Sequence, residues 1–123
     1  MLKKYQKRKT KELIAVIYAR FSCDKQLDES IEDQLRVCME YAREHGITVV
    51  GQYCDYALSG RNDHRPQFLK MIEDSKSGSF NTVLLWKMDR FARNRWDSAI
   101  YKKELYNNGV TVISATEPIP EGG

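Results

Sequence analysis

The sequence predicts an α/β domain, with an open, mainly parallel β-sheet and helices on both of its faces. Four short apolar runs rich in β-branched residues recur along the 123 residues, and each is typical of a strand buried on both faces. Three segments with helical spacing of apolar residues separate these runs. Strands that alternate with helices in this way favour a parallel sheet. No internal repeat or second domain is evident.

The first half of the chain predicts two strands and the helix between them. Residues 13–18 form the first apolar run. Ser30, with Asp33 three residues later, is typical of a helix N-cap, and Gly46 is typical of the end of that helix. The second strand follows over residues 47–54. The apolar face expected for this helix consists of Ile31, Leu35, Cys38, Met39 and Ala42.

The second half predicts two further helices and two further strands. Pro66 suits the first turn of a helix that ends near residues 77–79. A third buried strand follows over residues 82–86, a helix over residues 96–107, and a fourth strand over residues 110–113. The apolar face expected for the helix that begins at Pro66 consists of Phe68, Leu69, Met71 and Ile72.

Positive charge is concentrated at the N-terminus of the chain. The net charge is +3, and six lysines and arginines lie within residues 1–11. Removing these six charges leaves −3 on the remaining residues, so the folded part is not a basic protein. We therefore predict a solvated basic tail over residues 1–11, one folded domain over residues 12–117, and over residues 118–123 the start of a linker to further C-terminal regions.

The composition excludes several classes of protein. A hydrophobic fraction of 41% with 30% charged residues argues against a disordered chain. No run approaches the ~18–20 apolar residues of a membrane span, and no apolar secretion signal follows the N-terminus. Cys23, Cys38 and Cys54 include no CxxC pair, which argues against a disulfide framework and a structural zinc site. We expect a cytoplasmic protein with no membrane partner and no cofactor.

Polar side chains cluster at the ends of three predicted strands. In an open α/β sheet, ligands bind outside the carboxyl ends of the strands. The first strand leads into Tyr18, Arg20, Ser22 and Gln26. The second leads into Asp55, Ser59, Gly60 and Arg65. The third leads into Lys87, Asp89, Arg90 and Arg93.

The residue types in this cluster suit phosphoryl chemistry. Converging arginines match phosphate oxygens and place positive charge before the reaction, and Ser22 supplies a hydroxyl nucleophile. His45 and His64 are distant from Ser22 in the sequence, so a Ser-His-Asp triad has little support. Arginines accompany Asp55 and Asp89, which disfavours a magnesium site. Each residue alone is also compatible with a turn or a surface ion pair, but a cationic cluster at three strand ends favours a functional site.

Three motifs, in order, resemble the catalytic domain of the serine recombinases, the resolvase/invertase family. The first is YARFS at residues 18–22, with Gln26 and SIEDQ at residues 30–34. The second is DYALSG at residues 55–60, followed by RPQF. The third is KMDRFARN at residues 87–94, which contains the Asp-Arg-x-x-Arg block. The resemblance covers residues 12–117. The motif sequences are most similar to those of the large serine recombinases, which are phage integrases and mobile-element transposases.

The resemblance implies site-specific DNA recombination without ATP or metal. Ser22 attacks the DNA phosphodiester to form a 5′-phosphoserine intermediate, and strand exchange and religation follow. The implied phosphate-binding and transition-state arginines are Arg20, Arg65, Arg90 and Arg93. Asp55 and Asp89 orient these arginines. The further implied contacts to the phosphate or the DNA backbone are Tyr18, Gln26, Ser59, Gly60 and Lys87.

The implied partners are double-stranded DNA and further copies of the protein. The family implies a homodimer on each DNA site, a tetramer at synapsis, and a bacterial, phage or mobile-element protein at the nucleoid. The family's long helix after the fourth strand and a C-terminal DNA-binding domain have no match in these 123 residues. We therefore expect this chain alone to bind DNA with little sequence specificity and to recombine it poorly.

Three other functions remain open from the sequence. The first is a non-catalytic DNA-binding or regulatory domain of the same fold. The second is a phospho-acceptor similar to response regulators, although Arg20 and Ser22 stand where an acidic pair is needed. The third is a metal-dependent nuclease. The recombinase interpretation is preferred because the candidate nucleophile and the arginines are all present.

Overall fold

The computed structural model describes residues 12–22, 30–57, 65–87 and 95–117. Within these ranges, four strands form one sheet in the order β2-β1-β3-β4, and every neighbouring pair is parallel. The strands are β1 (Ile14–Ser22), β2 (Thr48–Ala57), β3 (Thr82–Leu85) and β4 (Thr111–Ser114). The helices are α2 (Ile31–His45), α3 (Pro66–Asp74) and α4 (Arg95–Asn107), with a 3₁₀ turn, η1 (Ser75–Ser77), after α3. The predicted tail and linker, residues 1–11 and 118–123, lie outside these ranges.

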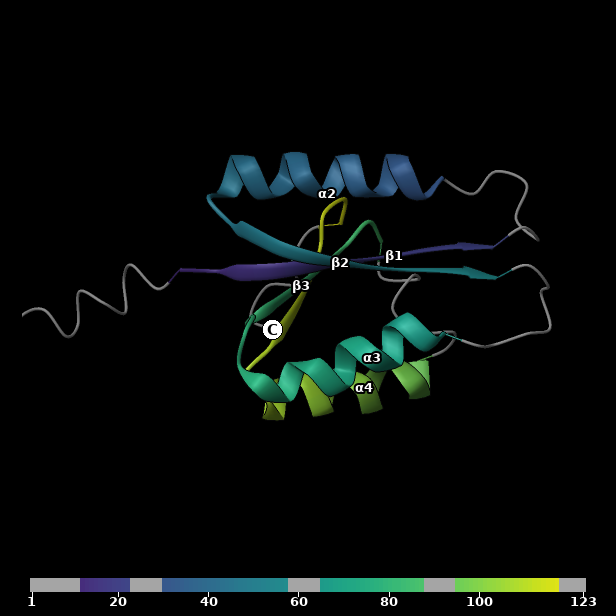
Figure 1. The fold of residues 1–123 in the computed structure, drawn as a ribbon, viewed down its shortest axis with the longest axis vertical. Helices are drawn as coiled ribbons and strands as arrows, with labels where there is room; N and C mark the ends of the chain where they lie inside the picture. The colour runs from purple at the N-terminus through teal and green to yellow at the C-terminus, as the bar shows by residue number, and fades with distance from the viewer. Residues whose placement is uncertain (1–11, 23–29, 58–64, 88–94, 118–123) are drawn as a thin grey trace, which may run out of the picture.

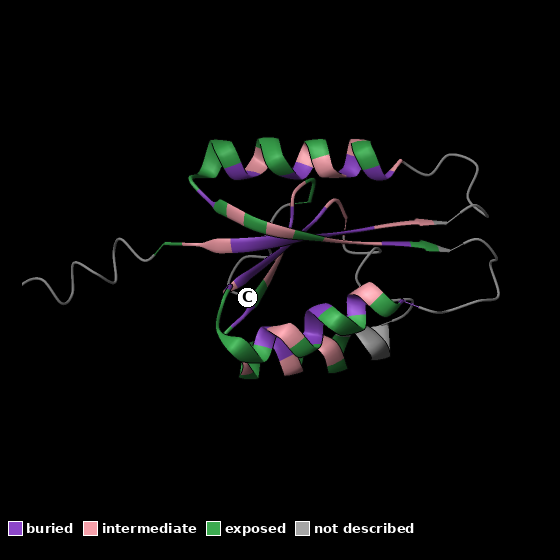
Figure 2. Ribbon diagram, in the orientation of Figure 1, coloured by how far each residue is buried: buried purple, intermediate pink, exposed green. Residues whose placement is uncertain are grey.

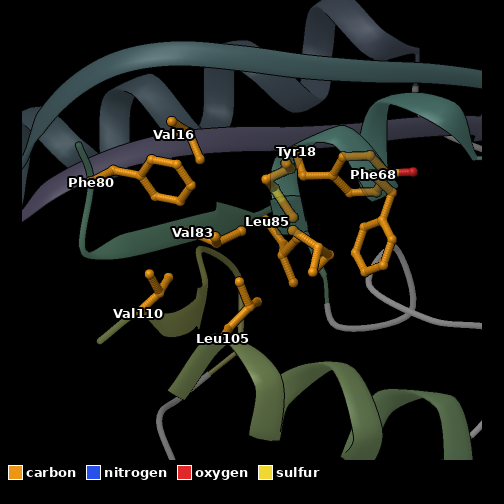
Figure 3. Close-up of a cluster of buried hydrophobic side chains, with 10 residues drawn as sticks. Val16, Tyr18, Phe68, Phe80, Val83, Leu85, Leu105 and Val110 are labelled. Atoms are coloured by element: carbon orange, nitrogen blue, oxygen red, sulfur yellow. The ribbon is translucent and has the colours of Figure 1, made fainter. Parts of the chain in front are cut away.

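Helices cover both faces of the sheet, as predicted. Figure 1 shows α2 on one side and α3 with α4 on the other. One apolar cluster joins the sheet to α2 through Cys38 and Ala42. A second cluster joins the opposite face to α3 and α4 through Phe68, Met71 and Leu105 (Figure 3). None of the helices in the described ranges has both the length and the apolar character needed to cross a membrane.

The predicted ends of α2 are confirmed. The hydroxyl of Ser30 accepts a hydrogen bond from the backbone amide of Asp33 at 3.1 Å, which satisfies one of the free amides of the first turn. Gly46 ends the helix with φ at +68°, a left-handed conformation that glycine adopts without steric cost. Figure 2 shows that the exposed residues of α2 lie on the side away from the sheet.

The predicted apolar faces were wrong at two positions. Met39 of α2 is 43% exposed and Leu69 of α3 is 51% exposed. Each follows a fully buried residue, Cys38 or Phe68, and one residue turns an α-helix by about 100°. That rotation carries the side chain off the face that packs on the sheet.

The strands β1 and β2 extend further than the sequence predicted. Their ladder continues to the pair of Ser22 with Ala57, whereas β3 pairs with β1 only as far as Tyr18 and Leu85. Backbone pairing between β1 and β2 therefore carries polar residues into the strands themselves. Arg20 and Asp55, which were expected after the strands, are directly paired partners within them.

A bulge in β2 changes which of its side chains face each helix layer. The register of β1 with β2 shifts between Ala15 and Val16, so Val50 is an extra residue between Val49 and Gly51. Val49 packs on the cluster beneath α2, but Tyr53, four residues later, packs on the cluster beneath α3 and α4. Because of the extra residue, the side chains of β2 that follow the bulge face the opposite side of the sheet from the one that simple alternation predicts.

Tyr53 connects β2 to the end of α3. Its hydroxyl donates a hydrogen bond to the Asp74 carboxylate at 2.7 Å, and the ammonium of Lys70 approaches the same oxygen at 3.3 Å. Burial and this hydrogen bond raise the pKa of Tyr53 to about 12. The hydrogen bond from Tyr53, together with Lys70, lowers the pKa of Asp74 below its ordinary value of 3.8.

Replacing Tyr53 with phenylalanine tests this connection through its pH dependence. At neutral pH we expect a lower unfolding midpoint than for the wild type, because the carboxylate loses its donor. Since the pKa of Asp74 is lowered by folding, the stabilisation is complete above 3.8 and is lost as the pH falls through the folded value. The difference between the proteins should therefore shrink in acid. Urea unfolding from pH 7 to pH 2 measures it.

The control for this experiment is Tyr106→Phe, which changes a largely exposed tyrosine on α4. We expect no change in its unfolding midpoint relative to the wild type at any of these pH values. A Tyr53→Phe deficit that stays constant down to the lowest pH would show that Asp74 is not the acceptor responsible.

Candidate active site

The Asp55 carboxylate caps helix α3 from the neighbouring strand. One carboxylate oxygen accepts a hydrogen bond from the backbone amide of Gln67 at 3.0 Å, and the other accepts from the amide of Phe68 at 3.0 Å. Pro66, at the first position of the helix, has no amide hydrogen to satisfy. Arg65 makes no side-chain cap, so a strand residue performs the role that an N-cap side chain usually has. The negative charge also lies at the positive end of the helix dipole.

Tyr18 is the third donor to the same carboxylate. Its hydroxyl lies 2.8 Å from Asp55, and its ring is completely buried in the cluster beneath α3 and α4 (Figure 3). Burial raises the pKa of Tyr18 well above its ordinary value, and the negative charge of Asp55 raises it further, while the nearby charges of Arg65 and Arg20 act in the opposite direction. The phenol therefore stays protonated and donates. The sequence grouped Tyr18 with phosphate contacts, whereas the structure places its hydroxyl on Asp55.

Arg65 is held against two aromatic rings. Only 7% of the residue is exposed, and its guanidinium carbon lies 4.2 Å from the ring centre of Phe68. The ring centre of Tyr101, on α4, lies 5.8 Å from the same atom. A cation over an aromatic face is attracted by the ring quadrupole, and more strongly when water is excluded. The side chain of Arg65 is thus placed next to the N-terminus of α3 that Asp55 caps.

Gln34 of α2 was not recognised by the sequence analysis as a site residue. Its side-chain amide donates to the backbone carbonyl of Arg20 at 3.0 Å and accepts from the backbone amide of Arg20 at 3.3 Å. Because β3 pairs with β1 only as far as Tyr18, this amide takes the place of a strand partner for Arg20. Gln34 is fully buried. A polar residue on the buried stripe between Ile31 and Cys38 was the available signal, because a buried amide needs partners.

Lys87 lies at the same edge of the sheet, just after the end of β3. It is half-buried, and its ammonium lies 5.0 Å from the ring centre of Trp86. Trp86 is in turn fixed through its backbone carbonyl, which accepts a hydrogen bond from the hydroxyl of Thr116 at 2.6 Å. The carboxyl ends of β1, β2 and β3 therefore carry Arg20, Asp55 and Lys87 to one edge of the sheet, as the sequence predicted.

The remaining predicted site residues are not part of this geometry. Ser22 is the last residue of β1, and its backbone pairs with Ala57, two residues beyond the pair of Arg20 with Asp55. Six further predicted residues lie outside the described ranges: Gln26, Ser59, Gly60, Asp89, Arg90 and Arg93. Among the residues that the structure describes, no group of three or more histidine, cysteine, aspartate or glutamate side chains could hold a metal ion.

The described part of the site suits an anionic ligand. It contains the buried carboxylate of Asp55, which accepts hydrogen bonds from the Tyr18 hydroxyl and two backbone amides. It also contains Arg20 and Arg65, whose positive charges lower the pKa of Tyr18. The carboxylate is already satisfied by hydrogen bonds, and the side chain of Arg65 is held between two aromatic rings. Positive charge that is positioned in advance stabilises an anion without the cost of reorganisation.

Comparison with known proteins gives a family match over most of the chain. The family model described as Resolvase, N terminal domain matches residues 15–122. The transposon Tn552 DNA-invertase BinR of Staphylococcus aureus is 37% identical over 62 residues, which are 50% of this chain and 31% of that protein. The transposon Tn552 resolvase of the same organism is also 37% identical over 62 residues, 30% of its length. The match thus spans about a third of these curated relatives.

Solved structures match over a larger part of their length. The N-terminal catalytic domain of TP901-1 integrase has a TM-score of 0.75 and 32% identity, covering 86% of this chain and 79% of that chain. A resolvase family site-specific recombinase from Streptococcus pneumoniae has a TM-score of 0.77 and 30% identity, covering 89% and 76%. The C-terminal catalytic domain of the ISC1926 TnpA serine recombinase matches with a TM-score of 0.71 and 29% identity, covering 86% and 72%.

Asp55→Ala tests whether this carboxylate holds α3 in place. The variant leaves two backbone amides and the Tyr18 hydroxyl without their buried acceptor, so we expect the free energy of unfolding to fall by about 2–4 kcal/mol. Urea denaturation followed by circular dichroism measures the change. Glu73→Ala removes an exposed carboxylate from the same helix and should cost less than about 0.5 kcal/mol. Equal losses in the two variants would contradict the capping role.

Gln34→Leu tests the clamp on the backbone of Arg20. Leucine keeps the apolar packing but leaves the amide and carbonyl of Arg20 without this partner, which should lower the free energy of unfolding by about 2 kcal/mol. Hydrogen exchange of the Arg20 amide should also become faster. Gln52→Leu, at an exposed position of β2, is the matched control and should leave that exchange rate unchanged. Unaltered exchange at Arg20 in Gln34→Leu would rule out the clamp.

Proposed function

The chain belongs to the resolvase family of serine recombinases, and on this premise we propose that it is the catalytic domain of a site-specific DNA recombinase in which Ser22 is the nucleophile. The observation that carries the proposal is the pairing of Arg20 with Asp55 two residues before Ser22, with Arg65 held beside the helix that Asp55 caps. Both arginines thus belong to the sheet edge where β1 ends, and this supports the proposal. A phosphodiester needs positive charge at that place when it is attacked.

The proposed reaction conserves the energy of the DNA backbone bond. The Ser22 oxygen forms a bond to the scissile phosphorus, and the bond from phosphorus to the 3′ oxygen breaks. The 5′ end is then joined to the serine, and the 3′ oxygen leaves with a proton that balances the one lost by the serine. Attack by the 3′ hydroxyl of another DNA end reverses these steps and releases the enzyme.

Arginines do the work that a metal ion does in many nucleases. Guanidinium groups bind two phosphate oxygens at once and keep their charge at every physiological pH. We assign phosphate binding to Arg20 and Arg65, which belong to the described part of the site. We assign the same role to Arg90 and Arg93 from the family motif. Asp55 and Asp89 are proposed to orient the arginines. Tyr18 is proposed to act through Asp55, because its hydroxyl donates to that carboxylate.

Other residues of the motifs are proposed to hold the DNA. Gln26, Ser59, Gly60 and Lys87 are assigned to contacts with the phosphate or the neighbouring backbone. The half-buried Lys87 supports this assignment by its position at the end of β3. We assign the catalytic domain to residues 12–117, with a basic tail over residues 1–11.

The partners are proposed from the same premise. Double-stranded DNA is the substrate, and we propose a homodimer on each recombination site and a tetramer when two sites are joined. The names of the relatives, a DNA-invertase and a resolvase of a transposon of Staphylococcus aureus and the TP901-1 integrase, support a protein encoded by a mobile element. Its DNA substrate then places it in the cytoplasm of a bacterium.

Covalent capture on DNA tests the proposed function. The protein in its full natural length is mixed with a nicked duplex that carries the ends of the genetic element encoding it, in EDTA, and the reaction is stopped with SDS. We expect a covalent protein–DNA adduct with the wild type and none with Ser22→Ala, because only the serine oxygen joins the DNA. Gel electrophoresis of DNA labelled at its 3′ ends detects the adduct, because the strand joined to the serine keeps its original 3′ end.

The matched control is Ser79→Ala, which changes an exposed serine before β3 and should leave the yield of adduct unchanged. An adduct that survives in Ser22→Ala would move the nucleophile to another residue. Adduct formation that needs a divalent metal would favour the metal-dependent nuclease. A wild-type protein that binds the duplex but gives no adduct would favour a non-catalytic DNA-binding domain.

A further inference from the structure

Two aromatic rings from different helices surround the guanidinium of Arg65. Phe68 lies on α3, one helical turn after Arg65, and Tyr101 lies on α4. The rings meet edge to face, with centres 5.0 Å apart and an angle of 89° between their planes. The Arg65 guanidinium carbon is 4.2 Å from the first ring centre and 5.8 Å from the second. An arginine that is 93% buried is thus bounded by the faces of two helices.

The geometry points to Tyr101 as a positioning residue for Arg65, a role that rests on the proposed recombinase function. Phe68 belongs to the same helix as the arginine and moves with it. Tyr101 is attached to α4, which begins at Arg95, directly after the segment with Asp89, Arg90 and Arg93. Its ring therefore connects Arg65, which belongs to the second motif, with α4, the helix that follows the third motif.

The ring of Tyr101 supplies something that an aliphatic side chain cannot. Burial removes water from the guanidinium, which costs free energy that its surroundings must compensate. An aromatic ring compensates in part through its quadrupole and also packs as an apolar group. Tyr101 does both, because it lies against the apolar cluster of α3 and α4 and also against Arg65. A leucine at the same place would retain the packing and lose the attraction for the cation.

The sequence offered no sign of this role. Tyr101 is outside all three motifs, and its position on α4 is typical of an ordinary core residue. Its proximity to Arg65 becomes visible only when α3 and α4 are placed side by side on one face of the sheet (Figure 1). Phe68 links the two, because its ring contacts those of both Tyr18 and Tyr101.

The first test observes Arg65 directly in the 123-residue chain labelled with ¹⁵N-arginine. The side-chain Nε–H resonance of Arg65 is assigned with Arg65→Lys, and ring currents should displace it from the position of a solvated arginine. Tyr101→Leu should move the resonance toward that position, and Tyr101→Phe, which keeps the ring, should leave it in place. A Tyr101→Leu protein that is folded by circular dichroism and retains the wild-type resonance would overturn the proposal.

The second test measures the rate of covalent capture on the nicked duplex. Tyr101→Leu should slow adduct formation roughly tenfold, the effect expected when a desolvated cation loses an aromatic partner, while Tyr101→Phe should be within about twofold of the wild type. In an Arg65→Ala background, Tyr101→Leu should have no further effect, because there is no guanidinium left to position. Equal slowing in both backgrounds would show a purely structural role and overturn the proposal.

The two tests separate failure of the positioning role from failure of the proposed function. If Ser22→Ala still forms the adduct, or the wild type forms none, the recombinase mechanism is wrong. The displacement of the Arg65 resonance by Tyr101→Leu then still decides whether Tyr101 positions the arginine, because that measurement needs neither DNA nor catalysis.

Discussion

The buried carboxylate of Asp55 holds three parts of the molecule together. It joins β2, on which it lies, to the ring of Tyr18 on β1 and to the first free amides of α3. Burying a carboxylate is expensive unless its oxygens are satisfied by hydrogen bonds. Here three donors satisfy it, and one of them is a phenol that burial keeps protonated. Asp55 thus fixes the N-terminus of α3, beside which Arg65 lies.

The site lies where the strands end unevenly. In the sheet order β2-β1-β3-β4, the chain passes from β2 across β1 to reach β3, and ligands in open α/β sheets bind beside such a switch in strand order. β1 and β2 continue past the end of β3, which removes the strand partner of Arg20 on that side. Gln34 replaces the missing partner with its amide. The backbone of Arg20 thus stays satisfied beyond the end of β3.

The order of elements could be predicted from the sequence, because apolar periodicity, caps and spacing are local properties. Ser30 and Gly46 show this, because Ser30 begins α2 and Gly46 ends it, each through a hydrogen bond within one turn of the helix. The role of Asp55 could not be predicted, because its partners are 12 to 37 residues away in the chain. The bulge at Val50 was also hidden, since a one-residue change of register leaves no sign in a short apolar strand. Gln34 interrupts the apolar stripe of α2, but its partner, the backbone of Arg20, lies 14 residues away and could not be predicted from that pattern.

The way in which Arg65 is held has a consequence for the proposed reaction, in which arginines take the place of a metal ion. A metal ion is a concentrated charge that orients its own ligands, whereas a guanidinium sits on a long flexible side chain whose ordering costs free energy. If the side chain became ordered only in the transition state, the cost of ordering it would raise the activation barrier. In this fold much of that cost is met during folding, because the rings of Phe68 and Tyr101 hold the side chain in the folded protein. In the proposed reaction, a preorganised Arg65 would stabilise the developing charge on phosphorus with little further loss of entropy.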